Sequence, residues 1–296
     1  METRTSTAPI VVGFDDSVHA HLALRWAMAE AALRNASLEI AYSLEWLPEL
    51  TDAISSTTEI RVQQRVQAMV EHARESAQRQ LPQLEVCATV HTGHPTTVLC
   101  ELSEHASMVV LGSRGRGGFT GLLTGSVSVG VATHAHCPVV VIRSLPAGYT
   151  KLPVVAGVDE SPSAEQAIRF AFAEAARRRV PLVALRAWHP YVPSRYADGF
   201  LRAEEIAEIE SAESNFVHGY VERTAKSFPD VEVRYEIVAD VAATALTTAA
   251  ESAQLVVVGS RGRGGFTGLL LGSVGLHLLH NAACPVAIVR EPATGT

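Results

Sequence analysis

The chain has 296 residues, of which 47% are hydrophobic and 19% are charged, and its formal net charge is −7. This length accommodates two domains of ordinary size, and the composition excludes extensive disorder. Because an acidic chain with scattered basic residues is repelled by phosphate backbones and anionic lipids, nucleic acid is not an expected partner.

In the first half of the chain, short apolar runs alternate with helical patterns. Strands are predicted at residues 10–14, 38–43, 85–91, 108–112 and 139–142, and helices at residues 20–34, 59–80, 96–106 and 126–136. Strands separated by helices of this length indicate βαβ units with right-handed crossovers. The predicted fold class is therefore α/β, with a doubly wound parallel sheet.

The second half of the chain repeats the first. Residues 112–127 (GSRGRGGFTGLLTGSV) and residues 259–274 share fifteen of sixteen amino acids. Other landmarks keep their order at an offset of 144 residues early in the repeat and 147 residues late in it. We therefore predict two copies of one domain, at residues 1–145 and 153–293, joined by a linker at residues 144–152 that contains Pro and Gly.

The cellular compartment is predicted from what the sequence lacks. No apolar segment follows Arg4 as a signal peptide would require, and no run of 18 uncharged apolar residues predicts a membrane span. The cysteines Cys87, Cys100, Cys137 and Cys284 have no CxxC spacing, and we expect them to be small core residues in a reducing compartment. The predicted location is cytoplasmic.

A glycine-rich loop lies between the fourth predicted strand and the next helix in each copy. Each glycine loses backbone entropy on folding, so this concentration needs a physical reason. Phosphate binding provides one, because amides without a neighbouring Cβ can approach an anion and the helix N-terminus adds partial positive charge. Arg114, Arg116, Arg261 and Arg263 add positive charge, and Ser126 can cap the helix or donate to a phosphate oxygen.

Two familiar phosphate motifs do not fit this loop. A Walker A loop ends in Gly-Lys-Ser/Thr, and no lysine follows either glycine loop. A dinucleotide fingerprint would follow the first strand, where residues 14–17 read Phe-Asp-Asp-Ser instead. The spacing present in both copies is GxxG, nine residues, then Gly-Ser.

That spacing, with GxDxS at residues 13–17 and 157–161, resembles the ATP-binding branch of the universal stress protein family in its tandem-domain form. The resemblance implies the strand order 3-2-1-4-5 in each domain. Strands 1 and 4 are then neighbours at the switch point where open α/β sheets bind ligands. The implied ligand is ATP, and Mg²⁺ is expected to accompany its phosphates, with Ser126 near the ion.

The resemblance also implies two matching sets of nucleotide-binding residues. The first set is Gly13, Asp15, Gly112, Ser113, Arg114, Gly115, Arg116, Gly117, Gly118, Gly125, Ser126 and Val127. The second set is Gly157, Asp159, Gly259, Ser260, Arg261, Gly262, Arg263, Gly264, Gly265, Gly272, Ser273 and Val274. Asp15 and Asp159 would line the adenine and ribose side, and they also suit an Asx-turn at a strand end. The family's Gly-x-Pro after the third strand is present at residues 93–95, but residues 239–241 read Ala-Asp-Val.

The expected function is an ATP-binding regulator of the stress or dormancy response, without strong catalytic activity and at most a weak ATPase. No nucleophile–base pair is evident, and no metal ligands are predicted, because His134 and His136 correspond to Asn281 and Ala283. The alternatives are a nucleotide-hydrolysing or adenylating enzyme of a related α/β class, and an interaction module that binds no nucleotide. An adenine nucleotide is the expected partner, a homodimer is left open, and the sequence does not identify a protein partner.

Overall fold

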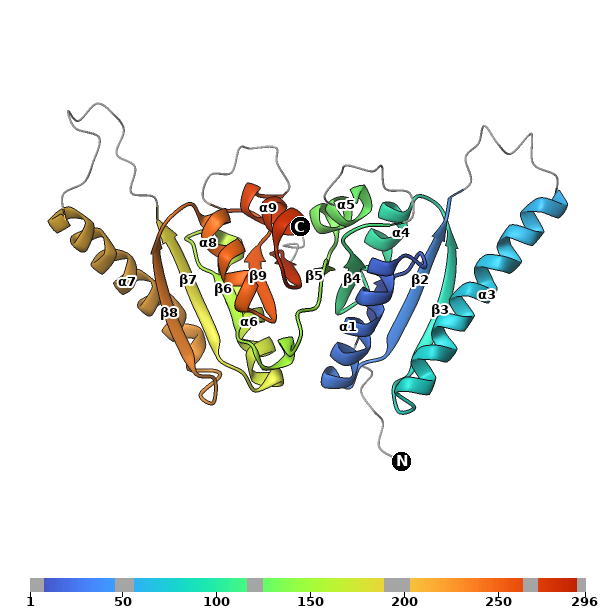
Figure 1. The fold of residues 1–296 in the computed structure, drawn as a ribbon, viewed down its shortest axis with the longest axis horizontal. Coiled ribbons are helices and arrows are strands. Elements are labelled where there is room, and N and C mark those ends of the chain that lie inside the picture. The colour runs from blue at the N-terminus through green and yellow to red at the C-terminus, as the bar shows by residue number, and fades with distance from the viewer. Residues whose placement is uncertain (1–7, 46–55, 116–124, 189–202, 263–270, 292–296) are drawn as a thin grey trace, which may run out of the picture. The chain divides into compact units, whose positions relative to one another are not determined.

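The computed structural model describes residues 8–45, 56–115, 125–188, 203–262 and 271–291. The described residues divide into two compact units, one ending at Ser144 and the other running from Leu145 to Glu291 (Figure 1). Each unit holds one copy of the sequence repeat.

The elements follow one another in the same order in both units. The first unit contains β1 (Ile10–Gly13), α1 (Val18–Arg34), β2 (Leu38–Leu44), α3 (Ser56–Gln80), β3 (Val86–Thr92), α4 (Pro95–Leu102), β4 (Met108–Gly112), α5 (Ser126–His134) and β5 (Val139–Ile142). The second unit contains the 3-10 turn η1 (Tyr149–Lys151), β6 (Val154–Gly157), α6 (Pro162–Arg178), β7 (Leu182–Trp188), α7 (Ala203–Ala225), β8 (Val233–Ala239), α8 (Ala242–Ala249), η2 (Ala250–Ser252), β9 (Leu255–Gly259), α9 (Ser273–Asn281) and β10 (Val286–Val289).

The strand order confirms the predicted fold class. In the first unit the order is β3-β2-β1-β4-β5, and in the second it is β8-β7-β6-β9-β10, which is 3-2-1-4-5 in each copy. Neighbouring strands within each unit are parallel. Ile10 of β1 pairs with Leu38 of β2 on one side and with Met108 of β4 on the other. The carboxyl ends of β1 and β4 therefore lie side by side.

Helices cover both faces of each sheet. In the first unit, right-handed crossovers place α1 and α3 on one face and the neighbouring helices α4 and α5 on the other. The central strands are consequently buried on both sides, and Val110 of β4 and Val140 of β5 have no exposed surface. This explains why these strands read as continuous apolar runs instead of alternating patterns.

Two helices are shorter than predicted, each for a local reason. The helix α4 ends at Leu102 because the Ser103 hydroxyl bonds the Cys100 carbonyl at 2.5 Å and accepts the His136 N–H at 2.8 Å. The helix α5 ends at His134, before Pro138, which cannot continue a helix and keeps the preceding backbone extended.

The cysteine prediction is wrong for one residue. Cys137 and Cys284 are buried and Cys100 is half-buried, but Cys87 is exposed. Cys87 lies on β3, the outer strand of its sheet, whose alternate side chains reach a face that is only partly covered. Among the described residues, no helix has the length and apolar content that crossing a membrane requires.

Candidate functional site

The glycine loop of each unit leaves the carboxyl end of the fourth strand, and a hydrogen bond joins its two ends. In the first unit the Gly125 N–H donates to the Ser113 carbonyl at 2.7 Å, and the Ser113 N–H donates to the Ile142 carbonyl at 2.9 Å. In the second unit the Gly272 N–H donates to the Ser260 carbonyl, also at 2.7 Å. The same backbone frame therefore holds both loops.

The segment after β1 contacts the start of the first loop. The Ser17 hydroxyl donates to the Arg114 carbonyl at 3.2 Å, and one oxygen of Asp15 accepts the Ser17 N–H at 3.1 Å. The other carboxylate oxygen faces the loop, because a Cβ built on Gly115 would lie 2.6 Å from it. The structure thus brings Asp15 and the glycine loop together, and Asp15 also forms the Asx-turn that its position suggested.

Two of the predicted glycines are explained by packing within the fold. A Cβ on Gly112 would lie 2.6 Å from the backbone carbon of His19, and a Cβ on Gly13 would lie 2.5 Å from the side chain of Leu111. Gly112 therefore lets the first turn of α1 rest against the end of β4. Packing alone therefore explains why glycine occupies both positions, without reference to a ligand.

The N-terminus of α5 lies beside the start of the loop, because a Cβ built on Gly125 would lie 3.7 Å from the Cα of Arg114 and 3.8 Å from the backbone nitrogen of Gly115. Gly125 is the N-cap residue, and the described residues supply no side-chain hydrogen bond to that cap. The exposed Ser126 is the first helical residue, so it is not the cap of α5. Gly125 occupies the N-cap position in its place. The Ser128 hydroxyl donates to the Gly112 carbonyl at 2.7 Å and ties the helix to the end of β4. Uncapped amides and the helix dipole together favour an anion at this point.

The second copy reaches a similar arrangement through different hydrogen bonds. Asp159 accepts the N–H of Ser161 at 2.9 Å and also its hydroxyl. The Ser163 hydroxyl donates to the Arg261 carbonyl at 2.8 Å, and the Arg261 N–H donates back to it at 3.4 Å. A Cβ on Gly262 would lie 3.0 Å from Asp159. Gly272 caps α9 without a side-chain bond from the described residues.

The remaining predicted loop residues lie outside the described part of the chain. They are Arg116, Gly117, Gly118, Arg263, Gly264 and Gly265.

Sequence reasoning missed His19, which packs against Gly112 at the end of β4, and its counterpart Ser163, which is hydrogen-bonded to Arg261 at the start of the second loop. Their position in the sequence could have revealed them. Each lies two residues after the serine that precedes the helix, in the first helical turn, which packs against the end of the fourth strand. The pKa of His19 lies below its ordinary value because the side chain is partly desolvated and the positive charges of Arg114 and Arg143 are near it. The negative charge of Asp15 opposes this shift.

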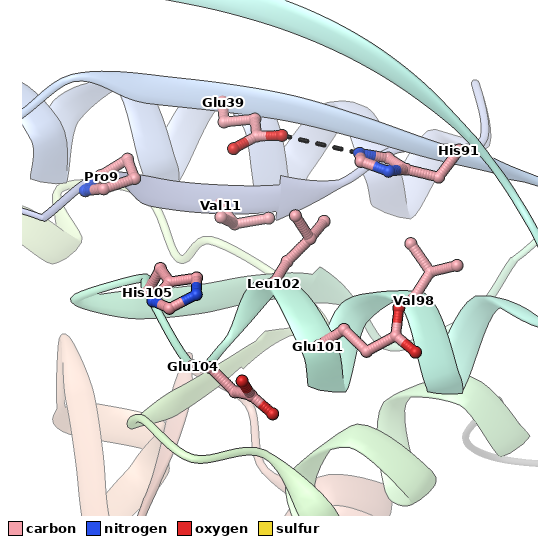
Figure 2. Close-up of a pocket in the computed structure, with 9 residues that line it drawn as sticks. All are labelled: Pro9, Val11, Glu39, His91, Val98, Glu101, Leu102, Glu104 and His105. Carbon is pink, nitrogen blue, oxygen red and sulfur yellow. Dashed lines mark ion pairs between the residues drawn. The ribbon is translucent and has the colours of Figure 1, made fainter.

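A separate cavity of about 450 Å³ lies beside α4 in the first unit (Figure 2). It is lined by Pro9, Val11, Glu39, His91, Val98, Glu101, Leu102, Glu104 and His105. The imidazole of His91 lies 3.7 Å from the Glu39 carboxylate. None of the predicted site residues lines this cavity, and the second copy has Val183 and Val238 in place of Glu39 and His91. The cavity is therefore not part of the duplicated site.

Within the described ranges, no group of three or more His, Cys, Asp or Glu residues is placed to hold a metal ion.

Fold and site together define a tandem α/β protein with a closed glycine loop after the fourth strand of each sheet. The model of the Universal stress protein family matches residues 7–143 and 152–290, and the chain belongs to this family. The predicted family and its tandem-domain form are thereby confirmed.

Individual proteins are similar to this chain over all or part of its length. A universal stress protein of Mycobacterium tuberculosis is 37% identical over 305 residues, which cover 99% of this chain and 100% of the relative. A universal stress protein of Archaeoglobus fulgidus has the same fold, with a TM-score of 0.72 at 16% identity and 97% of each chain covered. A further universal stress protein, solved in complex with cAMP, is 24% identical over 46% of this chain and 99% of its own, with a TM-score of 0.38.

Proposed function

We propose that this universal stress protein binds ATP at both glycine loops and acts as a nucleotide-dependent regulator of the stress or dormancy response. The two sites would belong to domains spanning residues 1–145 and 153–293. The supporting observation is that Arg114, the Asp15 carboxylate and a helix N-terminus without a side-chain cap bond from the described residues converge at the carboxyl ends of β1 and β4. That edge of a parallel α/β sheet is where ligands bind.

The groups at this edge suit the parts of a nucleoside triphosphate. The first-turn amides of α5 and the charge of Arg114 would hold anionic phosphate oxygens. The Asp15 carboxylate would accept hydrogen bonds from ribose hydroxyls, as an acidic residue does in other α/β nucleotide sites. Mg²⁺ bound to the phosphates would neutralise part of their charge, and the hydroxyl of Ser126, which is exposed, would approach the ion.

We propose a binding protein with at most weak ATPase activity. The described site supplies backbone donors, fixed charge and a carboxylate already engaged in an Asx-turn, which are means of binding and orienting a ligand. The enzyme alternative predicts saturable ATP turnover that is lost in Asp15→Ala. Rapid turnover of that kind in the purified protein would replace the binding role with a catalytic one. The cytoplasmic location and the homodimer stay predictions.

The substitution Gly115→Ala tests the placement of the first site. The backbone at residue 115 is not in the left-handed region, so alanine is compatible with the fold. Its Cβ would meet Asp15 at 2.6 Å, so the carboxylate must move away from the loop. We expect the wild type to bind two ATP per chain in equilibrium dialysis with Mg²⁺, and Gly115→Ala to lose about tenfold in affinity at one site only.

Two matched variants control this experiment. Gly262→Ala makes the same change in the second loop, where the Cβ would lie 3.0 Å from Asp159, so its effect should be smaller and confined to the other site. Gly219→Ala lies on α7 with nothing within 4 Å of its Cβ, so binding should not change. Far-ultraviolet circular dichroism should be native in all three. If the wild type binds no ATP, or if Gly115→Ala keeps both affinities, the proposed placement is wrong.

A further inference from the structure

The two loops are identical in sequence where they start, but the residue that packs against them differs. In the second unit Ser163 is hydrogen-bonded to both the carbonyl and the N–H of Arg261. The corresponding residue in the first unit is His19, whose Cβ lies 2.8 Å from a Cβ built on Gly112. One copy therefore has a neutral hydroxyl bonded at the start of its loop, and the other has a histidine whose backbone and Cβ pack against the end of β4, the residue before its loop.

Charged groups face His19 from three different segments of the first unit. Arg114 belongs to the loop after β4, Arg143 follows β5, and Asp15 follows β1. On its own helix, His21 is turned to Asp16, with the imidazole 3.0 Å from the carboxylate. Partial burial and the positive charges of Arg114 and Arg143 lower the pKa of His19 and so disfavour its protonated form, and the negative charge of Asp15 opposes this shift.

We propose that His19 is a phosphate-binding residue of the first site that gains a proton when a nucleotide binds, which makes that site, unlike the second, bind more tightly as pH falls. This inference rests on the proposed function, because it assigns a further residue to the same site.

The direction of the effect follows from charge. Phosphate oxygens bound at the loop would offset the positive field of Arg114 and Arg143 and add negative charge near His19. The pKa of His19 would then be higher in the complex than in the free protein, so one imidazole nitrogen takes up a proton from solvent on binding. By linkage, affinity increases as pH falls through the pKa of the complex and levels off below the pKa of the free protein.

The experiment compares ATP binding by the full chain at pH 8.0 and at pH 5.5 in the wild type, His19→Ser and His21→Ser. His19→Ser introduces the residue type that the second copy carries. A rise of one pKa unit on binding corresponds to about a tenfold gain in affinity at low pH. We therefore expect the ratio of first-site affinities, wild type to His19→Ser, to increase about tenfold between pH 8.0 and pH 5.5. Protonation of ATP itself cancels in this ratio.

Proton uptake provides a second readout, which a purely structural role of His19 would not produce. Calorimetric titration in buffers of different ionisation enthalpy should show protons taken up at the first site of the wild type and of His21→Ser. The uptake should be missing in His19→Ser and at the second site of every variant. His21 is exposed and paired with Asp16, so it controls for removal of a nearby histidine.

The outcomes separate this inference from the proposed function. If two ATP bind and the wild type and His19→Ser share one pH profile, the role of His19 is refuted while nucleotide binding stands. If no ATP binds to the wild type at either pH, the proposed function fails, and the inference fails with it.

Discussion

Arg186 is a buried cation in the second unit whose removal should strongly destabilise that domain. Its side chain is 1% exposed on β7. It lies 2.6 Å from Glu213 and 3.1 Å from Glu160, donates to the Val158 carbonyl at 3.3 Å, and stacks 4.8 Å from the centre of the Phe216 ring. The substitution Arg186→Met keeps much of the volume and removes every one of these charge interactions.

The loss in free energy of unfolding depends on which carboxylates are left buried without a compensating positive charge. The Glu213 side chain is only 21% exposed, whereas Glu160 is 47% exposed and can be solvated by water. Removing one partner of a buried ion pair typically costs about 3–5 kcal/mol, and because only Glu213 stays largely buried we expect about 3 kcal/mol. The matched control is Arg234→Met, which breaks an exposed pair with Glu232 and should cost less than about 1 kcal/mol.

Urea unfolding followed by tryptophan fluorescence can isolate this domain. In a Trp26→Phe, Trp46→Phe background, Trp188 is the single tryptophan, and it lies on the same strand as Arg186. Adding Glu213→Gln to Arg186→Met removes the uncompensated charge and should recover part of the loss. If Arg186→Met costs less than about 1 kcal/mol, or if the double variant shows no recovery, the buried ion pair does not have the role assigned to it.

Two further predictions concern a helix and the thiols. Gly219→Ala on the exposed face of α7 should raise the free energy of unfolding of the second domain by about 1 kcal/mol, measured in the same urea assay, because alanine has the higher helix propensity; no gain would contradict this. In native protein, a colorimetric disulfide reagent should react faster with exposed Cys87, although partial desolvation raises its pKa, than with Cys137 or Cys284, whose pKa burial raises to about 12; persistence of the faster phase in Cys87→Ser would contradict this.

The strand positions could be predicted closely because the signal is local. The predicted strands at residues 108–112 and 139–142 agree with β4 and β5 to the residue, since each apolar run is bounded by a glycine, a proline or polar residues. Helix ends were predicted less well where distant groups decide them. The end of α4 depends on a hydrogen bond from His136 to Ser103, 33 residues apart, which no local pattern shows.

The candidate site was only partly predictable for the same reason. Ser17 and the Arg114 carbonyl are 97 residues apart, and only the strand order inferred from the family resemblance brought their segments together. Arg186 gave no functional or structural signal, because its compensating Glu213 lies on α7, 27 residues later. A charged residue in an apolar strand can be interpreted only when its partners in space are known.

The hydrogen bonds around the two loops explain how loops that differ at a single residue can differ in behaviour. In the first copy the Ser17 hydroxyl accepts the Ala20 N–H and holds the Arg114 carbonyl, so position 19 is not needed to anchor the loop. In the second copy the Ser161 hydroxyl donates to Asp159, and Ser163 anchors the loop in its place. Moving the anchoring hydroxyl by two residues therefore frees position 19 for a titratable side chain. The same exchange in the second copy would remove the loop's anchor, so the two sites are not interchangeable even though their loop sequences are nearly identical.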